Sequence, residues 1–394
     1  MTSHTFTDLV GDEKEFFAEY FNKKPLLRKG ALKDPQGILS LRRLDELVQL
    51  EVIRPPYLRA NLKGAGVPDQ GFTQTVTVQG TDLTDAIVPE KVYELFRAGA
   101  TIVWSSLNHL DSSLRSFTRV ISDRFGARTD CVAFLTPAGK QGFSPHHDPV
   151  DLFIVQTEGT KRWRLWNPAE VRKGEAASYT AEQLGEPVID VLLEPGDVLY
   201  LPYDTPHAAA AEELASVHLS IMVRPRMWKD LLQQTFEELV REPQFNEFPF
   251  IGANPQDAGT EALFAQKLRA VAERLTAVEP GSELDRLAEL GRRMPGNSAG
   301  HTFQSTARLD ALEPDAPMRR TDAVVEFGTP DDGRVQLTVN GHRIAVPAPV
   351  AEILAGMAAG QETAAAGVFP GVPAERATRM AQGLARIGLL EAAA

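Results

Sequence analysis

Four of the eight histidines lie between residues 130 and 225, and two of these are consecutive and directly precede an aspartate. In the run His146-His147-Asp148, residues i and i+2 of a strand share a face, so His146 and Asp148 point the same way. His147 would point to the other side, and the residue two positions after it is Pro149, which offers no ligand atom. The spacing therefore predicts that one imidazole and one carboxylate of this run bind the same metal ion.

A third ligand has to come from a distant strand. The segment from Gly196 to Pro202, which continues to Pro206-His207, supplies a histidine at a junction between a turn and a strand. Two histidines and one carboxylate cover one face of an octahedral metal and leave three positions open, which is typical of non-haem Fe(II) oxygenases. His146, Asp148 and His207 are therefore the expected Fe(II) ligands, and the open positions would take a co-substrate and O2.

Lys161 is the expected anchor for an acidic co-substrate. It follows the hairpin turn Thr157-Glu158-Gly159-Thr160 and lies on the strand that pairs with the metal-bearing one. An ammonium group there can neutralise a carboxylate that extends away from the metal.

The other polar residues of this region have plainer interpretations. A His-x-Asp triplet alone is a weak signal, because these residues also meet by chance on a surface. We expect His147 to lie outside the ligand set. His218 and Ser220 share the polar side of their strand, and we expect them to line the cavity of the co-substrate, although a competing ligand role for His218 stays open.

Three further assignments complete the reading of this region. Asp151 could replace Asp148 as a ligand only if its strand bulged. Asp197 is expected to be a turn residue. The large apolar side chains are expected to form the barrel core: Phe153, Trp163 and Trp166.

Short strands are expected to position these residues. Between Asp130 and Pro225 the β-runs are CVAFLTP, VDLFIVQ, KRWRLW, PVIDVLL, DVLYLP and SVHLSIMV, separated by Gly, Pro and Asp. Such regular spacing predicts a barrel or a double-sheet jelly roll. Before them, apolar residues at helical spacing predict helices, with one strand at Phe72 to Val78: Glu13 to Phe21, Ser40 to Leu50, Pro89 to Phe96 and Asp111 to Phe125.

The remainder of the chain has two further patterns of predicted secondary structure. Residues 227–293 have a helical pattern with one apolar stripe. After a loose stretch come two β-runs, with the turn signal Asn340-Gly341 inside the second, and then two helical stretches. We therefore expect an α+β protein with three parts: a cupin-type barrel with N-terminal helices (1–225), a helical domain (226–315) and a winged-helix-like module (316–394).

Composition limits the class of protein. The 394 residues are 43% hydrophobic and 24% charged, as in ordinary globular proteins. The net charge of −12 disfavours a broad nucleic-acid-binding surface. A single cysteine, Cys131, and the lack of a secretory segment or an apolar stretch long enough to span a bilayer lead us to expect a cytoplasmic protein without membrane contact.

The run from Leu135 to Pro168, LTPAGKQGFSPHHDPVDLFIVQTEGTKRWRLWNP, resembles the JmjC-type ribosomal oxygenases. These are cupin-like 2-oxoglutarate-dependent protein hydroxylases with a double-stranded β-helix barrel. The resemblance extends to Phe16 to Gly30 and to EPGDVLYLPYDTPHAA, and the order of the three parts fits the same family.

This resemblance implies that His146, Asp148 and His207 bind Fe(II) and that Lys161 pairs with the distal carboxylate of 2-oxoglutarate. It also implies homodimers formed through the helical domain, and a substrate side chain such as an arginine or histidine of a ribosomal protein. One departure is the strand Cys131 to Phe134, where family members often carry polar residues such as Asn and Tyr.

Two other functions stay open. A hydroxylase could tailor a ribosomally made peptide natural product instead of a ribosomal protein, and a basic substrate of either kind suits the acidic chain. From another class, a non-catalytic metal-binding cupin could bind nucleic acid through its winged-helix-like tail. The few basic residues of that tail disfavour this third reading: Arg334, Arg343, Arg376, Arg379 and Arg386.

Overall fold

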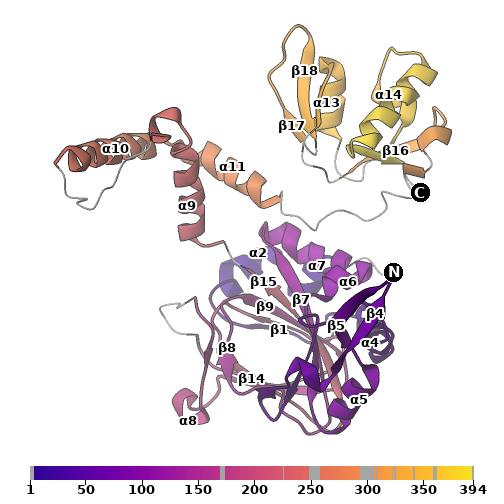
Figure 1. Cartoon of the computed structure of the whole chain (residues 1–394), viewed down its shortest axis with the longest axis vertical. Coiled ribbons are helices and arrows are strands. Elements are labelled where there is room, and N and C mark those ends of the chain that lie inside the picture. Colours follow the sequence, from indigo (N-terminus) through magenta and orange to yellow (C-terminus); the bar gives the residue numbers. More distant parts are fainter. Residues whose placement is uncertain are drawn as a thin grey trace. The chain divides into compact units, whose positions relative to one another are not determined.

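The computed structural model describes most of the chain, and its contacts divide it into two compact units, Met1–Gly291 and Arg292–Ala394. We describe each unit by itself (Figure 1). The described residues are 4–168, 174–224, 226–247, 258–292, 306–307, 309–321, 323, 325–339, 342–357 and 362–392. No described helix is both long and apolar enough to cross a membrane.

Two antiparallel sheets form the centre of the first unit. The larger sheet has eight strands in the order β1 (Leu26–Arg28), β13 (Val198–Leu201), β9 (Asp151–Glu158), β15 (Ser216–Val223), β7 (Thr129–Thr136), β6 (Thr101–Trp104), β2 (Leu58–Leu62) and β3 (Ala65–Gly66). The smaller sheet has the order β11 (Ala177–Ser178), β8 (His146–His147), β14 (His207–Ala211), β10 (Lys161–Leu165) and β12 (Ile189–Leu193). All six β-runs expected from the sequence form strands of these sheets.

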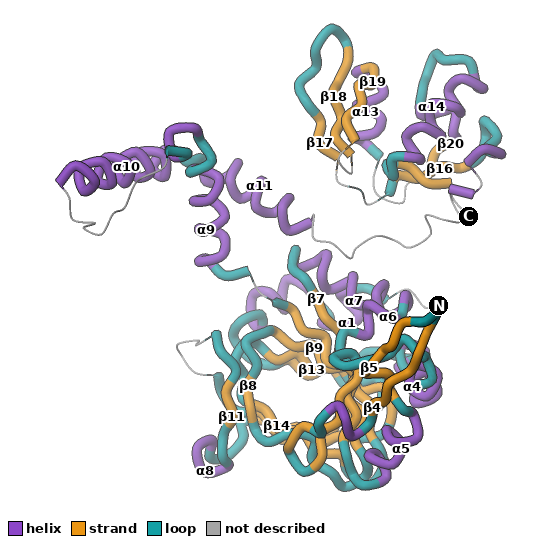
Figure 2. The backbone as a smooth tube through the Cα atoms, viewed as in Figure 1, coloured by secondary structure: helices purple, strands orange, loops and turns teal. Residues whose placement is uncertain are grey.

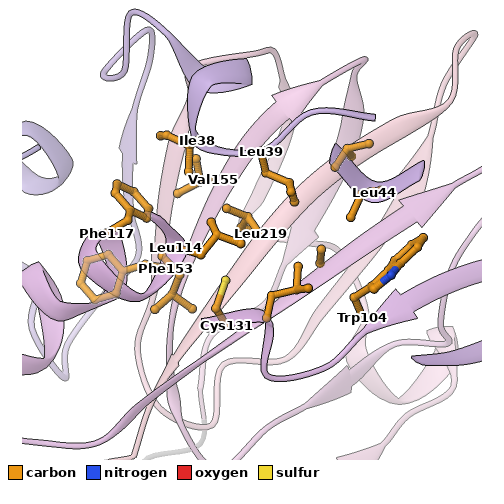
Figure 3. Packing of buried hydrophobic residues seen from close by; sticks show 14 of the residues in the cluster. Ile38, Leu39, Leu44, Trp104, Leu114, Phe117, Cys131, Phe153, Val155 and Leu219 are labelled. Carbon is orange, nitrogen blue, oxygen red and sulfur yellow. The ribbon is translucent and has the colours of Figure 1, made fainter. Parts of the chain in front are cut away.

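Alternation along the strands separates the two faces of the larger sheet. On β9, Phe153 and Val155 belong to a core shared with the N-terminal helices, whereas Leu152 and Ile154 pack with Trp163 of the smaller sheet. The N-terminal helices therefore cover the outer face of the larger sheet, and the two sheets enclose the inner face. Figure 3 shows part of the outer core, with Phe153, Val155 and Leu219 of the sheet close to Leu114 and Phe117.

The helices that cover the outer face begin and end for identifiable local reasons. In α7 (Ser112–Phe125), the side chain of Asp111 accepts hydrogen bonds from the first main-chain N–H groups, and Gly126 ends the helix at a φ of 54°. The other predicted helices are also present, as α2 (Glu13–Glu15) with a π-helical turn (Phe16–Tyr20), α4 (Leu41–Val48) and α5 (Pro89–Arg97). The predicted strand is β4 (Thr73–Val78), which pairs with β5 (Thr81–Ile87).

Three helices follow the sheets in the first unit, and Figure 2 shows the change from strands to helices. They are α9 (Trp228–Leu239), α10 (Ala258–Ala277) and α11 (Pro280–Arg292). Thr235 of α9 donates a hydrogen bond to Glu283 of α11 (2.6 Å), and Arg226 donates one to the carbonyl oxygen of Leu287 (2.8 Å). Several large apolar side chains of these helices are nevertheless exposed: Trp228, Leu232, Phe236, Leu263, Phe264, Leu268, Leu275 and Leu284.

The second unit has its own hydrophobic core, which includes Met318, Leu337, Leu354 and Leu384. One three-stranded sheet consists of β20 (Glu362–Ala364), β16 (Pro317–Arg320) and β21 (Leu390–Ala392). The other consists of β17 (Val325–Phe327), β18 (Arg334–Val339) and β19 (His342–Pro347), accompanied by α13 (Ala348–Gly356) and α14 (Ala374–Arg386). The pairing of β18 with β19 confirms the expected hairpin, while its turn, Asn340-Gly341, lies outside the described residues.

Candidate metal and co-substrate site

The three predicted metal ligands come together on the smaller sheet. His146 of β8 lies directly opposite His207 of β14 in the antiparallel pairing, and Asp148 follows β8 by one residue. Nε2 of His146 lies 3.7 Å and Nε2 of His207 4.0 Å from Oδ2 of Asp148. One ligand atom from each residue lies within 4.8 Å of the other two. One metal ion could contact all three atoms.

Main-chain carbonyl groups fix the tautomer of both histidines. Nδ1 of His146 lies 2.8 Å from the carbonyl oxygen of Ser144, and Nδ1 of His207 lies 2.9 Å from that of Thr205. Because a carbonyl oxygen only accepts, each Nδ1 carries the proton and each Nε2 keeps its lone pair. This is the usual orientation of a histidine that binds metal through Nε2.

The electrostatic environment also suits a metal cation. Burial, together with the neighbouring His146, lowers the pKa of His207 to about 4, so its imidazole is neutral near pH 7. Asp148 keeps 38% of its side-chain surface exposed, which leaves the site open on the carboxylate side. Two imidazole nitrogens and one carboxylate fit Fe(II) and leave part of its coordination sphere free.

His147 is not brought to this cluster. Its side chain is buried, its Nδ1 accepts a hydrogen bond from the hydroxyl of Tyr179 (2.6 Å), and its Nε2 donates one to the carbonyl oxygen of Glu175 (2.7 Å). Asp151 is also apart from it, because its carboxylate accepts a hydrogen bond from Tyr200 (2.5 Å), a residue of the outer core. Neither residue is placed to join the three candidate ligands.

Lys161 is the first residue of β10. The last residue of the same strand, Leu165, lies opposite the metal ligand His207. The ammonium nitrogen of Lys161 donates a hydrogen bond to Oγ1 of Thr136 (2.9 Å) and lies 3.5 Å from Nδ1 of His218. The side chain is buried, and no ion pair with a carboxylate is found for it among the described residues. Burial lowers its pKa to about 7. A buried ammonium group with only neutral partners is electrostatically incomplete, and an anion beside it would supply the missing charge.

His218 connects this end of the site to the metal end. Its ring stacks on Phe134 of β7 (centroids 4.9 Å apart) and meets the edge of Trp163 (5.3 Å), whose other neighbour is His207 (5.8 Å). Burial and the charge of Lys161 lower the pKa of His218 well below its usual value. Ser220 is also buried on β15, two residues further along the same side.

Thr136 and Phe134 were not anticipated from the sequence. On β7, Cys131 and Ala133 face the outer core, so Phe134 and Thr136 face the opposite way, toward His218 and Lys161. Alternation alone could have assigned them to the inner face, but their partners depend on the register between β7 and β15. The apolar strand noted in the sequence thus offers one hydroxyl group, from Thr136.

The turn assignment of Asp197 and the core assignment of three aromatic residues agree with the structure, whereas the turn at 157–160 connects the two sheets and is not a hairpin, because β9 and β10 do not pair with each other. Asp197 lies in the turn before β13 and also accepts hydrogen bonds from Lys29 (2.6 Å) and the main chain of Gly30 (2.8 Å). Trp163, Trp166 and Phe153 are buried, as expected for core residues, although Trp163 also contacts His207 and His218.

Comparison with known proteins points to one family. Residues 104–231 match the family model described as the JmjC domain. Ribosomal oxygenase 1 of Danio rerio is 30% identical over 227 residues, which is 56% of this chain and 40% of that protein.

The chain contains a JmjC domain and is similar to the ribosomal oxygenases.

Another relative, the bifunctional lysine-specific demethylase and histidyl-hydroxylase NO66 of Drosophila melanogaster, is 26% identical over 324 residues, which is 79% of this chain and 43% of that protein. This JmjC-type chain therefore spans less than half the length of these curated relatives.

Solved structures show the same fold over nearly the whole chain. Escherichia coli ycfD aligns with a TM-score of 0.58 over 97% of this chain and 98% of that one, at 20% identity. A structure of the same ribosomal oxygenase in complex with cobalt and 2-oxoglutarate aligns with a TM-score of 0.56, also at 20% identity. At this level of identity the likeness establishes the JmjC-type cupin fold.

Proposed function

We propose that this chain is an Fe(II)- and 2-oxoglutarate-dependent dioxygenase that hydroxylates an arginine or histidine side chain of a ribosomal protein. The observation that carries the proposal is the pairing of two features on one face of a barrel. Three ligand atoms meet at one end, and a buried ammonium group without a carboxylate partner among the described residues lies at the other. The names of the curated relatives and the cobalt and 2-oxoglutarate bound to ycfD support the same chemistry.

His146, Asp148 and His207 would hold the metal, with the proton kept on Nδ1 of each histidine by a main-chain carbonyl group. When bound, Fe(II) supplies O2 activation coupled to the decarboxylation of 2-oxoglutarate to succinate. The contribution of the protein is to present three donors from two paired strands and the adjoining loop, and to leave the remaining positions open.

Lys161 would bind the distal carboxylate of 2-oxoglutarate, assisted by the hydroxyl of Thr136. His218 and Ser220 would line the same space between Lys161 and the metal. The rings of Phe134 and Trp163, which flank His218, would keep water away from the reacting groups.

The substrate class rests on charge and on the relatives. A net charge of −12 attracts basic proteins, which ribosomal proteins commonly are, and increases the rate of encounter with them. We place the reaction in the cytoplasm, where the single cysteine, Cys131, would remain reduced.

The decisive experiment is mass spectrometry of ribosomal proteins incubated with iron, 2-oxoglutarate, O2 and either the wild type or the Asp148→Ala variant. We expect one added oxygen on one arginine or histidine, with succinate formed in equal amount, only with the wild type. Succinate without any modified ribosomal protein would refute the substrate and favour a peptide substrate. Metal binding without succinate above the variant's background would refute the enzyme and favour a non-catalytic metal-binding protein.

We also propose that the helical segment forms a homodimer. Trp228, Leu232 and Phe236 recur every four residues on α9 and are at least 45% exposed, as one apolar stripe. Burial against the same stripe of a second copy would remove it from water. Light scattering should report a dimer for the wild type and a monomer for the Trp228→Ser/Phe236→Ser variant, and an unchanged mass of that variant would exclude this surface.

The C-terminal unit is proposed to be the winged-helix-like module expected at 316–394, preceded by the helical domain at 226–315. Its two small sheets and two helices around a separate core suit that assignment. We assign it a role in substrate or subunit contact, because few basic residues are available for nucleic acid.

A further inference from the structure

Asp204 occupies a costly position three residues before His207. Its backbone lies in the left-handed region (φ 59°), which glycine, Asn and Asp adopt more readily than other residues, and its side chain is 3% exposed. A positive φ and a buried carboxylate each oppose folding, and they persist where the surroundings impose them, often at functional sites. Glycine would form the same turn without the steric penalty. The carboxylate therefore serves a purpose beyond the turn.

The contacts of Asp204 join both ligand-bearing segments. Its main-chain N–H donates a hydrogen bond to the carbonyl oxygen of Asp148 (3.2 Å), so it holds the chain directly at the carboxylate ligand. Its own chain continues through Thr205, whose carbonyl oxygen accepts the Nδ1–H of His207. One residue thus links the main chain of Asp148 to the turn that orients His207.

The side chain of Asp204 adds a third segment. Oδ2 accepts a hydrogen bond from the main-chain N–H of Gly174 (3.2 Å), and Oδ1 lies 3.8 Å from Nε2 of His147. His147 in turn contacts Glu175 and Tyr179. These contacts hold the segment 174–179, which includes β11, against β8 on the side away from the ligands. The main chain of β11 also pairs with β8.

We propose that Asp204 is a positioning residue for the metal centre. The carboxylate of Asp204 holds the 174–179 segment against His147, and its N–H fixes the main chain of Asp148. The carboxylate of Asp148 therefore faces the two imidazoles before metal binds. This inference rests on the proposed metal site. Partners that orient ligands in this way typically contribute about 10- to 100-fold to metal affinity.

The test is a titration of the full chain with Co(II), monitored by visible absorption, together with thermal unfolding of the metal-free protein. Asp204→Gly keeps the backbone conformation and removes the carboxylate. Asp204→Asn is nearly isosteric, tolerates a left-handed φ and keeps an oxygen for Gly174. Asp332 is an exposed aspartate at φ 45° in the turn between β17 and β18, and Asp332→Gly is the matched control.

We expect the dissociation constant for Co(II) to rise about 10- to 100-fold in Asp204→Gly, and to stay within about threefold of wild type in Asp204→Asn and Asp332→Gly. The metal-free proteins should unfold at similar temperatures. Equal affinity of Asp204→Gly and wild type would overturn the inference, as would a loss that Asn fails to restore. If Asp204→Gly does not fold, Asp204→Ser, which also lacks the carboxylate, replaces it under the same criteria. A wild type that binds no Co(II) would instead refute the proposed metal site.

Discussion

The metal end and the Lys161 end of the site are built in opposite ways. At the metal end, both histidine ligands are oriented in advance, because main-chain carbonyl oxygens hold their Nδ1 atoms. At the other end, the buried ammonium group of Lys161 contacts the hydroxyl of Thr136 and the ring of His218, and it has no carboxylate partner among the residues that the structure describes. The difference indicates that the metal end is complete in donors before metal binds, whereas the Lys161 end is completed by the anion it binds.

Removing one metal ligand should produce the largest effect. In His146→Ala, two donors remain, and we expect metal binding and succinate formation to fall to background. Metal titration and a succinate assay measure the two quantities. His342→Ala, at an exposed histidine in the other unit, is the control and should behave as wild type. Substantial succinate formation by His146→Ala would remove it from the ligand set.

Removing the ammonium group should affect the co-substrate and spare the metal. For Lys161→Met we expect KM for 2-oxoglutarate to rise about 10- to 100-fold, the range for a hydrogen bond to a charged group. Co(II) affinity should remain at the wild-type value. Lys229→Met, on an exposed lysine of α9, is the control. Equal loss of metal and co-substrate affinity would mean that the two ends do not act separately.

The pH dependence of KM should follow the same lysine. Burial lowers the pKa of Lys161 to about 7, and only its charged form attracts a carboxylate. As pH rises above about 7, the free protein loses that charge, so KM for 2-oxoglutarate should increase by up to about tenfold per pH unit. Steady-state kinetics between pH 6 and 9 measure this. Lys161→Arg, which stays protonated, should flatten the profile, and a flat wild-type profile would contradict the prediction.

The smallest effect is expected at His218. His218→Asn removes the ring that stacks on Phe134 but retains a polar group near Lys161. We expect KM for 2-oxoglutarate to rise about three- to tenfold, the range for one neutral hydrogen bond, with metal affinity unchanged. A loss of metal affinity would instead favour the competing role of His218 as a ligand.

The sequence predicted the metal end better than the Lys161 end for a physical reason. His146 and Asp148 are two positions apart, so local geometry determines that they share a side, even though β8 ends at His147. The contact of Lys161 with Thr136 and the stacking of His218 on Phe134 depend on how β7 pairs with β15. Such register is set by tertiary packing, and alternation within one strand does not specify it.

Turn residues show the same limit. Asp197 was expected to be a turn residue, but its hydrogen bonds to Lys29 and Gly30 join segments far apart in the chain. Asp204 drew no attention in the sequence, because an aspartate between Tyr203 and Thr205 gives no local sign of burial or of a positive φ. Both residues act through partners brought together only by the folded barrel.

The pairing of His146 with His207 has a consequence for folding. These residues close a long loop of the chain, and bringing the ends of that loop together costs conformational entropy. Strand β8 has only two residues, so its pairing offsets this cost only weakly. A metal ion bound by both histidines and by Asp148 would act as a reversible cross-link across this loop. Metal would then strengthen chiefly the attachment of β8 to the smaller sheet, because β10 already pairs with β12 and with β14 over five residues each.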